Sequence, residues 1–349
     1  MAISENIIIF KNDAVGDLVQ SRDAIYNIIK KNSENKVILY LSERSKEFLF
    51  LFNYENVEIK IISYDLTLFE KMNIFYELFR KSIKKIYILT PKNFYYFLPI
   101  IFINIKFYAL VINSINNYQR PSAFLRKFLF KYVINDRATK SKRFSTMQIQ
   151  RNLTKENGDN HNFNLKKMPN FKKRELINID DYIYFHLKKS NFDKLGWGEN
   201  ELMMIFEEFL KYNKNIVFTK DIEKLDEISN YSKNFNIIDF STDKKILNNS
   251  NIYLCDNIIG SDLFHIINNS NKVVAFHGMM TNLASINQKN VLDLFYCKID
   301  SITDYRRYKN ALYEFIPRYK RYDLIVPSKD IKKTIRKMKF FLKKWPIRK

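Results

Sequence analysis

The sequence predicts an α/β protein of two successive domains, each built on a parallel sheet with helices over its faces. Short apolar runs rich in Ile, Val, Phe and Tyr alternate with longer stretches of helical pattern, which is typical of βαβ units. A polar stretch at 151–176 interrupts the alternation, which then resumes. The 349 residues suffice for two domains with separate cores. Two such halves around one linker indicate two Rossmann-like domains that face each other across a cleft.

Each strand is predicted from a short apolar run bounded by polar residues. In the first half, these runs lie at 7–10, 37–41, 57–62, 85–89 and 107–112. In the second half, they lie at 182–187, 215–219, 236–240, 272–276 and 291–295. The stretches between them predict helices at 17–31, 65–81, 199–212, 221–232, 261–268 and from residue 281. We therefore expect domains at 1–165 and 178–325 and a basic C-terminal helix at 329–349.

The composition is that of a folded chain without a disulfide framework. Hydrophobic residues make up 46% of it, with 22 Tyr and 30 Phe, which argues against disorder. Two cysteines, Cys255 and Cys297, fit a reducing compartment, and four scattered histidines argue against a zinc site. No secretory signal is visible, and Pro99 and Lys106 break the longest apolar run, 95–112. We therefore expect a cytoplasmic protein without a membrane span or a bound metal.

The net charge of +22 predicts an affinity for a polyanion, either nucleic acid or an anionic membrane face. The basic residues are concentrated at 104–151 and again at 329–349. The second segment also repeats apolar residues at helical spacing: Ile331, Ile335, Met338, Leu342 and Trp345. Such a helix can lie on an anionic surface, and it can also pack its apolar stripe back toward the first domain.

The strand at 7–10 runs through Lys11 and a short loop into Gly16 and Asp17. Gly16 lacks a Cβ, so the backbone there can turn sharply and approach a ligand. Asp17 is predicted at a helix start, where a carboxylate faces the positive end of the helix dipole. This position follows the first strand, where open α/β sheets bind ligands, so Asp17 is a candidate general base. Asp13, in the same loop, is the alternative base.

A second candidate site is the loop that follows the strand at 272–276 and opens a helix: His277, Gly278, Met279, Met280, Thr281 and Asn282. Backbone amides at a helix N-terminus bind phosphate without a metal, so this loop is a candidate for a nucleotide diphosphate. Lys11 and Lys194 are further candidate donor contacts, and His186 is a candidate at a strand end. Glu223 is a candidate acceptor of hydrogen bonds from a ribose. Capping, packing or a solvated surface position is the structural alternative for each of these side chains.

Three segments resemble, in order along the chain, the lipopolysaccharide heptosyltransferases of glycosyltransferase family 9. They lie at 11–17, 184–197 and 262–284. The family usually has Asp where this chain has His277, and His where it has Asn282. The resemblance implies a GT-B fold in which the first domain holds the acceptor and the second holds the nucleotide-sugar. It also implies that Asp17 takes the proton from the acceptor hydroxyl.

We therefore expect an inverting, metal-independent glycosyltransferase that moves a heptose-like or other sugar from a nucleotide-sugar to a lipopolysaccharide or other lipid-linked saccharide. The donor is a substrate, and no cofactor is expected. The expected location is peripheral, at the inner face of the cytoplasmic membrane. Because His277 stands where the family usually has Asp, a CMP-Kdo-type sugar transferase of GT-B fold is an alternative function. The other alternative is a non-catalytic, basic nucleic-acid-binding protein, although no recognised nucleic-acid motif is present.

Overall fold

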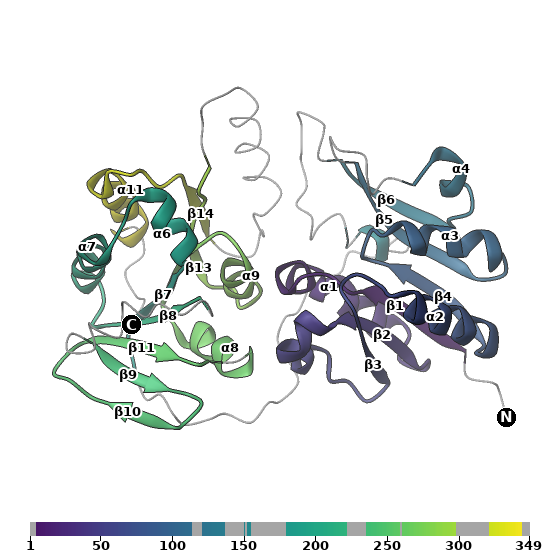
Figure 1. Cartoon of the computed structure of the whole chain (residues 1–349), viewed down its shortest axis with the longest axis horizontal. Helices are drawn as coiled ribbons and strands as arrows, with labels where there is room; N and C mark the ends of the chain where they lie inside the picture. Colours follow the sequence, from purple (N-terminus) through teal and green to yellow (C-terminus); the bar gives the residue numbers. More distant parts are fainter. Residues whose placement is uncertain are drawn as a thin grey trace. The chain divides into compact units, whose positions relative to one another are not determined.

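The structure is a computed structural model that describes residues 5–113, 121–136, 150, 152–154, 179–221, 235–258, 260–297 and 321–343 (Figure 1). The chain divides into two compact units. The first comprises residues 1–170 and 309–316, and the second comprises residues 171–308 and 317–349. Most of the predicted linker at 151–176 lies outside the described residues. In the described part, no helix is both long enough and apolar enough to cross a bilayer.

The first unit is built on a six-stranded sheet with the order β3-β2-β1-β4-β5-β6, and all its strands are parallel. The strands are β1 Asn6–Lys11, β2 Val37–Ser42, β3 Val57–Ile62, β4 Ile83–Ile88, β5 Lys106–Asn113 and β6 Lys131–Asp136. The helices are α1 Val15–Lys31, the 3-10 helix η1 Glu43–Phe52, α2 Leu68–Arg80, α3 Asn93–Ile101 and α4 Ala123–Arg126. All five strands predicted in this half are present. The central position of β1 explains its near-continuous apolar sequence, because both of its faces are covered.

The helices of the first unit cover opposite faces of its sheet. The chain adds strands in one direction from β1 to β3 and in the other direction from β4 to β6, so right-handed crossovers place the two groups of helices on opposite faces. Figure 1 shows α2, α3 and α4 in a row on one side of the sheet. Their inner residues, such as Ile74 and Tyr96, share one core cluster with Ile8 and Ile86 of the sheet.

The second unit is built on an eight-stranded sheet with the order β10-β9-β11-β8-β7-β12-β13-β14, which is parallel except for the pair β9 and β10. The strands are β7 Tyr182–Leu187, β8 Asn215–Lys220, β9 Asn236–Asp239, β10 Lys244–Ile246, β11 Ile252–Asp256, β12 Lys272–Phe276, β13 Asn290–Leu294 and β14 Tyr322–Ile325. The helices are α6 Lys189–Leu195, α7 Glu199–Leu210, α8 Gly260–Asn269, α9 Met279–Ile286 and α11 Ile331–Lys343. The five strands predicted here are present, whereas the helix predicted at 221–232 lies almost wholly outside the described residues.

The C-terminal helix α11 belongs to the second unit, so the prediction that it packs toward the first domain is wrong. Its apolar stripe, with Met338 at the centre, joins the core formed by α7 and the second sheet. Lys272 anchors the helix, because its Nζ donates to the carbonyl of Leu342 over 2.7 Å. The physical reason is local: β14 extends the second sheet just before α11 begins, which leaves the helix beside α7. Trp345 lies outside the described residues.

Both sheets have a point at which the strand order reverses, between β1 and β4 in the first and between β7 and β12 in the second. Ligands of open α/β sheets bind beyond the carboxyl ends of the strands at such points. The residues that follow these strand ends are therefore the places to look for a site.

Candidate functional site

The first candidate region, called here the first-sheet edge, comprises the last residue of β1 and residues that follow β1 to β4: residues 11–17, Arg44, Tyr64 and Lys92. Asn12 fixes its geometry from a fully buried position. Its Nδ2 donates to the carbonyls of Ser63 (2.9 Å) and Tyr64 (3.3 Å), and its Oδ1 accepts from the hydroxyl of Tyr95 (2.9 Å). Three segments distant in the sequence are thereby held together where β1 ends.

Lys11 and Asp13 form an ion pair at this edge. Nζ of Lys11 lies 2.6 Å from Oδ2 of Asp13, with 2% and 15% of the two side chains exposed. Nζ also lies 3.5 Å from the carbonyl oxygen of Leu89, at the end of β4. The structure thus brings two of the predicted site residues together, and Asp13 is already engaged by an ammonium group.

Asp17 lies in the first turn of α1, as the third residue of that helix, and its side chain is exposed. The helix begins at Val15, earlier than predicted, so Gly16 belongs to its first turn. The sharp turn expected at Gly16 is therefore absent. Ser21 supports this turn by donating from Oγ to the carbonyl oxygen of Asp17 over 2.9 Å.

Two cations lie against the ring of Tyr64 at the same edge. The guanidinium carbon of Arg44 is 4.1 Å and Nζ of Lys92 is 4.5 Å from the ring centroid. Burial raises the pKa of Tyr64, and the carboxylates of Asp13 and Asp17 raise it further. Both candidate bases therefore lie close enough to this ring to influence it.

Lys92 is the most unusual cation of the first-sheet edge. Its Nζ is buried, and it makes no hydrogen bond within the part of the chain that the structure describes. Asp65 is 4.0 Å away. Burial lowers the pKa of Lys92, although the carboxylates of Asp13 and Asp65 offset part of that effect. A buried ammonium without an acceptor is well suited to receive an anionic group from a ligand.

Arg44, Tyr64 and Lys92 are absent from the residues predicted from the sequence. Their positions did carry a signal, because each follows the carboxyl end of a strand by two to four residues: β2, β3 and β4. Applying the rule for open α/β sheets to every strand, and not only to the first, identifies them.

The second candidate region, called here the second-sheet edge, comprises the residues at and beyond the carboxyl ends of β7, β8, β12 and β13. His186, near the end of β7, is almost fully buried there. Its Nδ1 lies 2.9 Å from Oγ1 of Thr219, and its Nε2 lies 3.1 Å from Oδ1 of Asp221. Because both ring nitrogens contact side chains that follow or end β8, His186 orders this part of the edge.

The loop at His277 and Gly278 forms the centre of the second-sheet edge. Nδ1 of His277 lies 2.6 Å from Oδ2 of Asp293, and Asp293 is fully buried at β13. Gly278 has a φ of +156°, which disfavours other residues, and a Cβ built on it would meet no atom within 4 Å. A ligand can therefore approach this backbone closely.

Helix α9 begins directly after Gly278, so the amides of its first turn lie at this edge. Thr281 closes the turn: its Oγ1 donates to the carbonyl of Gly278 over 2.9 Å. The side chains of Met280, Thr281 and Asn282 are buried. Met279, the first residue of α9, is half-buried. For the three buried residues, the backbone rather than the side chain is placed to contact a ligand.

Lys194 lies in the last turn of α6, with its side chain exposed. Its Nζ is 5.9 Å from the ring centroid of Tyr296, just beyond β13. The ring of His277 packs against Phe295, the neighbouring residue, with the centroids 5.2 Å apart. Lys194 and His277 therefore both lie against the segment that follows β13. Glu223 lies outside the described residues, and those residues hold no group of three potential metal ligands among His, Cys, Asp and Glu.

Comparison with known proteins places the fold. No protein-family model and no curated protein matches the sequence. By structure, the chain is similar to ADP-heptose lipopolysaccharide heptosyltransferase II of Escherichia coli, with 10% identity, a TM-score of 0.59 and coverage of 97% of this chain and 98% of that one. A family 9 glycosyltransferase of Veillonella parvula gives 10% identity and a TM-score of 0.58, over 97% of this chain and 90% of that one.

A UDP-GlcNAc 2-epimerase of Methanocaldococcus jannaschii is also similar, with 12% identity, a TM-score of 0.54 and coverage of 98% and 94% of the two chains. The predicted class, an α/β protein with two Rossmann-like domains of the GT-B type, is confirmed. The predicted resemblance to family 9 is confirmed as a likeness of fold.

Proposed function

We propose that this protein is an inverting glycosyltransferase that transfers a sugar from a nucleotide-sugar to a lipid-linked or lipopolysaccharide-type saccharide. The observation that carries the proposal is the second-sheet edge, where an open Gly278 and the first turn of α9 follow a strand at the point of reversed strand order. Such an arrangement suits a diphosphate, because amides and the helix dipole supply positive potential without a metal.

Asp17 is the proposed general base. It is exposed on the first turn of α1, where the helix dipole favours a carboxylate, and Asp13, which pairs with Lys11, is the alternative base. The acceptor hydroxyl oxygen attacks the anomeric carbon from the side opposite the nucleotide, and Asp17 takes its proton. The bond between the anomeric carbon and the phosphate oxygen breaks, and the nucleoside diphosphate leaves with the electron pair. A positioned base of this kind contributes about 10²–10⁴-fold to the rate.

The proposed stabilisers of the leaving group are the first-turn amides of α9 together with Lys194 and His277. Each acts on the charge that develops on the departing diphosphate. On the first-sheet edge, Lys92 and Arg44 are the proposed contacts for an anionic group of the acceptor. ADP-heptose, named for the similar E. coli enzyme, is one donor to test. A CMP-sugar is another donor to test, because His277 stands where family 9 usually has Asp.

A thermal-shift screen with ADP-, UDP-, GDP-, dTDP- and CMP-sugars tests the donor first. With the donor in hand, Asp17→Asn is expected to lower turnover at least about a hundredfold while donor binding is retained. Asp65→Asn, a change at an exposed carboxylate of the same edge, is the matched control and is expected to be active. Full activity of Asp17→Asn together with loss in Asp13→Asn would transfer the role to Asp13.

The similarity to an epimerase makes one further control necessary. A transferase consumes its donor only when an acceptor, or slowly water, is present, whereas an epimerase converts the donor alone. Product analysis by mass spectrometry and NMR without an acceptor separates the two reactions. Formation of an isomeric nucleotide-sugar would contradict the proposed transfer.

A further inference from the structure

Helix α2 carries large apolar side chains on two opposite sides. Ile74 and Leu78 face inward and are buried. Leu68, Met72 and Phe79 follow one another at spacings of four and seven residues, which places them on the other side of the helix. They are strongly exposed, with 73% of Leu68 and 70% of Phe79 accessible, and Phe69 and Tyr76 beside them are exposed as well. A surface helix of a globular protein normally has a polar outer side.

Helices α3 and α4 continue this apolar surface. Phe97 and Ile101 of α3 are exposed, and so are Phe124 and Phe128 at and just beyond α4. Phe97 and Ile101 are four residues apart and so lie on one side of α3, and the rings of Phe124 and Phe128 contact each other, with their centroids 5.2 Å apart. The three helices are neighbours over the same face of the sheet (Figure 1). The ring of Phe79 in α2 lies 4.8 Å from that of Phe102 at the end of α3. We call these exposed residues of α2, α3 and α4 the outer face.

The charges on the outer face are positive. Arg80 lies over the ring of Tyr76, with 5.0 Å from its guanidinium carbon to the ring centroid, and Lys127 is exposed at α4. The three helices contain two acidic residues, Glu70 and Glu77. Glu70 forms the capping box of α2, with Oε2 accepting from the amide of Thr67 over 2.8 Å.

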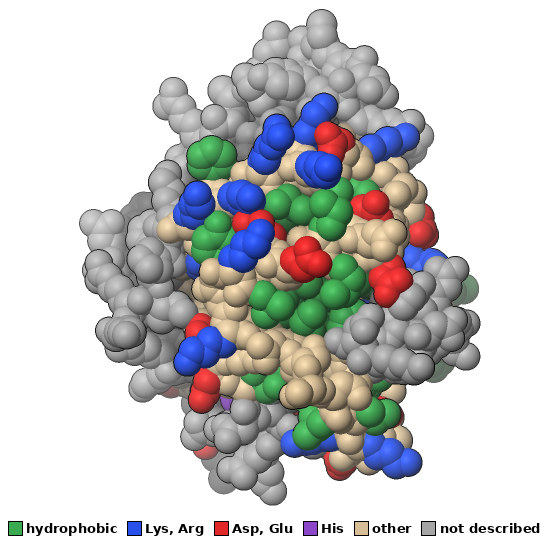
Figure 2. Space-filling view, turned by 90° about the vertical axis from the view of Figure 1, so that its left-hand side faces the viewer, with side chains coloured by type: hydrophobic (Ala, Val, Ile, Leu, Met, Phe, Trp, Pro, Cys, Tyr) green, Lys and Arg blue, Asp and Glu red, His purple; other side chains and the backbone are tan. Residues whose placement is uncertain are grey.

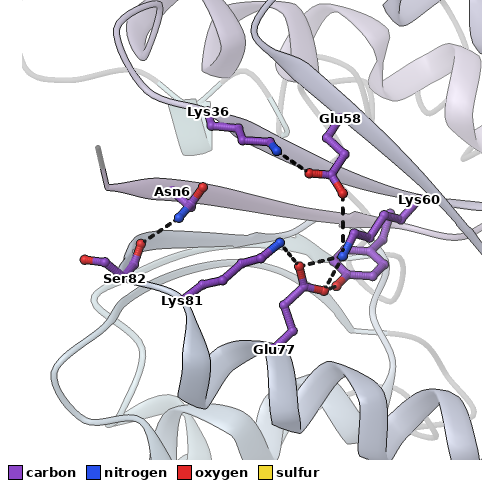
Figure 3. Close-up of polar contacts among 8 residues, drawn as sticks. Asn6, Lys36, Glu58, Lys60, Glu77, Lys81 and Ser82 are labelled. Atoms are coloured by element: carbon purple, nitrogen blue, oxygen red, sulfur yellow. Dashed lines mark hydrogen bonds and ion pairs between the residues drawn. The ribbon is translucent and has the colours of Figure 1, made fainter. Parts of the chain in front are cut away.

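Glu77 is neutralised on the sheet side of α2. Figure 3 shows its carboxylate between the ammonium groups of Lys60 and Lys81. The distance to Nζ of Lys60 is 2.6 Å, and the hydroxyl of Tyr40 donates to the same carboxylate. Glu77 is therefore paired with two lysines, whereas Glu70 keeps its charge at the N-terminus of α2, at the opposite end of the helix from Arg80.

We propose that the outer face docks on an anionic lipid bilayer and thereby brings the enzyme to a lipid-linked acceptor. Exposed aromatic and aliphatic side chains interleaved with Lys and Arg are what the interface of such a bilayer accommodates. The apolar groups enter the boundary of the acyl chains, and the cations meet the phosphates. A protein partner is the less favoured occupant, because the charged side chains named among these apolar residues, Arg80 and Lys127, are basic and so are complementary to a uniformly negative surface. The lipid-linked acceptor in this inference rests on the proposed function. The binding of vesicles can be measured whether or not that function is correct.

The basic helix α11 offers a different kind of surface. Figure 2 shows this side of the second unit, with lysine and arginine side chains gathered over its upper part and acidic side chains close by. Phe340 is the one strongly exposed apolar side chain of α11 within its described residues. Glu208 of α7 lies 3.4 Å from Nζ of Lys339. The basic side chains of α11 can contact an anionic surface, but its apolar stripe is buried in the core of the second unit and cannot enter a bilayer.

Co-sedimentation of the full chain with lipid vesicles tests the proposal. Phosphatidylcholine vesicles with and without phosphatidylglycerol are compared at low and high salt. The outer-face variant combines Leu68→Ser, Met72→Ser and Phe79→Ser. The matched control combines Ile246→Ser, Leu247→Ser and Phe340→Ser, which are exposed apolar residues of the second unit. A separate charge variant, Arg80→Glu with Lys127→Glu, is expected to weaken vesicle binding as well, and it replaces the triple variant if circular dichroism shows that the triple variant does not fold.

The wild-type chain is expected to bind the anionic vesicles and to be released by salt. The outer-face variant is expected to bind at least about tenfold more weakly, and the control within about twofold of wild type. Equal loss in variant and control, or no binding by wild type, would overturn the proposal. So would unchanged vesicle binding combined with a dimer that the variant converts to a monomer, which assigns the face to a second copy. Donor titrations on the same samples report on the proposed function separately, because a failure there leaves the vesicle result standing.

Discussion

Nδ1 of His277 lies 2.6 Å from Oδ2 of Asp293, and the same carboxylate oxygen accepts the hydroxyl of Tyr322. Asp293 is fully buried, and its Oδ1 has no hydrogen-bond partner among the described residues. The carboxylate therefore fixes one ring orientation of His277 beside the start of α9. It also occupies the core between β13 and β14.

This relationship predicts non-additive effects on nucleotide binding. His277→Ala is expected to weaken binding of the nucleoside diphosphate about tenfold, the effect of one charge-assisted hydrogen bond. Asp293→Asn is expected to weaken it as well, since the ring is no longer held, but to add little in the His277→Ala background. Isothermal titration of the three variants checks this. His265→Ala on α8 is the matched control. A further loss in the double variant would mean that Asp293 acts independently of His277.

Lys194 and Gly278 are predicted to act on the same diphosphate. Lys194→Ala is expected to weaken its binding about tenfold, whereas Lys189→Ala, on the same helix, leaves binding unchanged. Gly278→Val is expected to abolish binding, because a side chain would fill the open space above a backbone that itself resists a Cβ. Nucleotide titrations with a check of the melting temperature measure both. Normal affinity in both variants would place the phosphate elsewhere.

The sequence predicts the sheets well and the connections less well. The strands at 182–187 and 272–276 coincide with β7 and β12, because runs of buried β-branched and aromatic residues allow few other structures. The strands β6, β10, β11 and β14 and the 3-10 helix η1 were missed. They contain few residues and mixed polarity, so their conformation depends on neighbours that a local pattern does not reveal.

The same reasoning explains what was found and missed at the candidate site. Gly278 was recognisable because a glycine between a strand and a helix indicates a positive φ or a close approach of the backbone to a ligand. The position of Lys92 after a strand end could have been noted, but its contact with Tyr64 could not, because that contact depends on the order of the strands in the sheet. The apolar stripe of α11 was read correctly as one helical side. The prediction of the domain against which α11 packs was wrong, because an apolar stripe does not specify which hydrophobic core it joins.

Lys92 gives a prediction that separates stability from binding. Its ammonium is buried without a hydrogen-bond acceptor among the described residues, so Lys92→Met is expected to leave the free energy of unfolding unchanged or raise it by about 1 kcal/mol. Because burial lowers the pKa of Lys92, wild type is expected to gain stability relative to this variant as pH rises through that lowered value toward 10.5. Denaturant unfolding across this range measures it.

The same variant is expected to raise the acceptor KM at least about tenfold while donor binding stays normal, if Lys92 meets an anionic group of the acceptor. Lys46→Met, at an exposed lysine of η1, is the control for both measurements. A clearly lower stability of Lys92→Met, with an unchanged acceptor KM, would show that the cation serves the fold and not the ligand.

Glu77 gives the last prediction, which concerns pH. Burial alone would raise the pKa of Glu77, but hydrogen bonds from Lys60, Lys81 and Tyr40 hold it below its ordinary value of 4.5. A carboxylate whose pKa is lower in the folded state contributes stability above that ordinary value and loses it as pH falls through the folded value. Wild type is therefore expected to exceed Glu77→Gln by about 1–2 kcal/mol at pH 7. This estimate is reduced for screening, because 30% of Lys60 and 34% of Lys81 is exposed.

The difference between wild type and Glu77→Gln is expected to shrink below pH 4.5 and to vanish in stronger acid. Urea unfolding at a series of pH values from 7 to 3 measures it. Glu5→Gln is the control, because the pair of Glu5 with Lys84 is exposed on both sides and is expected to contribute less than about 0.5 kcal/mol at any pH. A difference for Glu77→Gln that stays constant across the series would mean that packing around Tyr40, and not the charge of Glu77, accounts for the stabilisation.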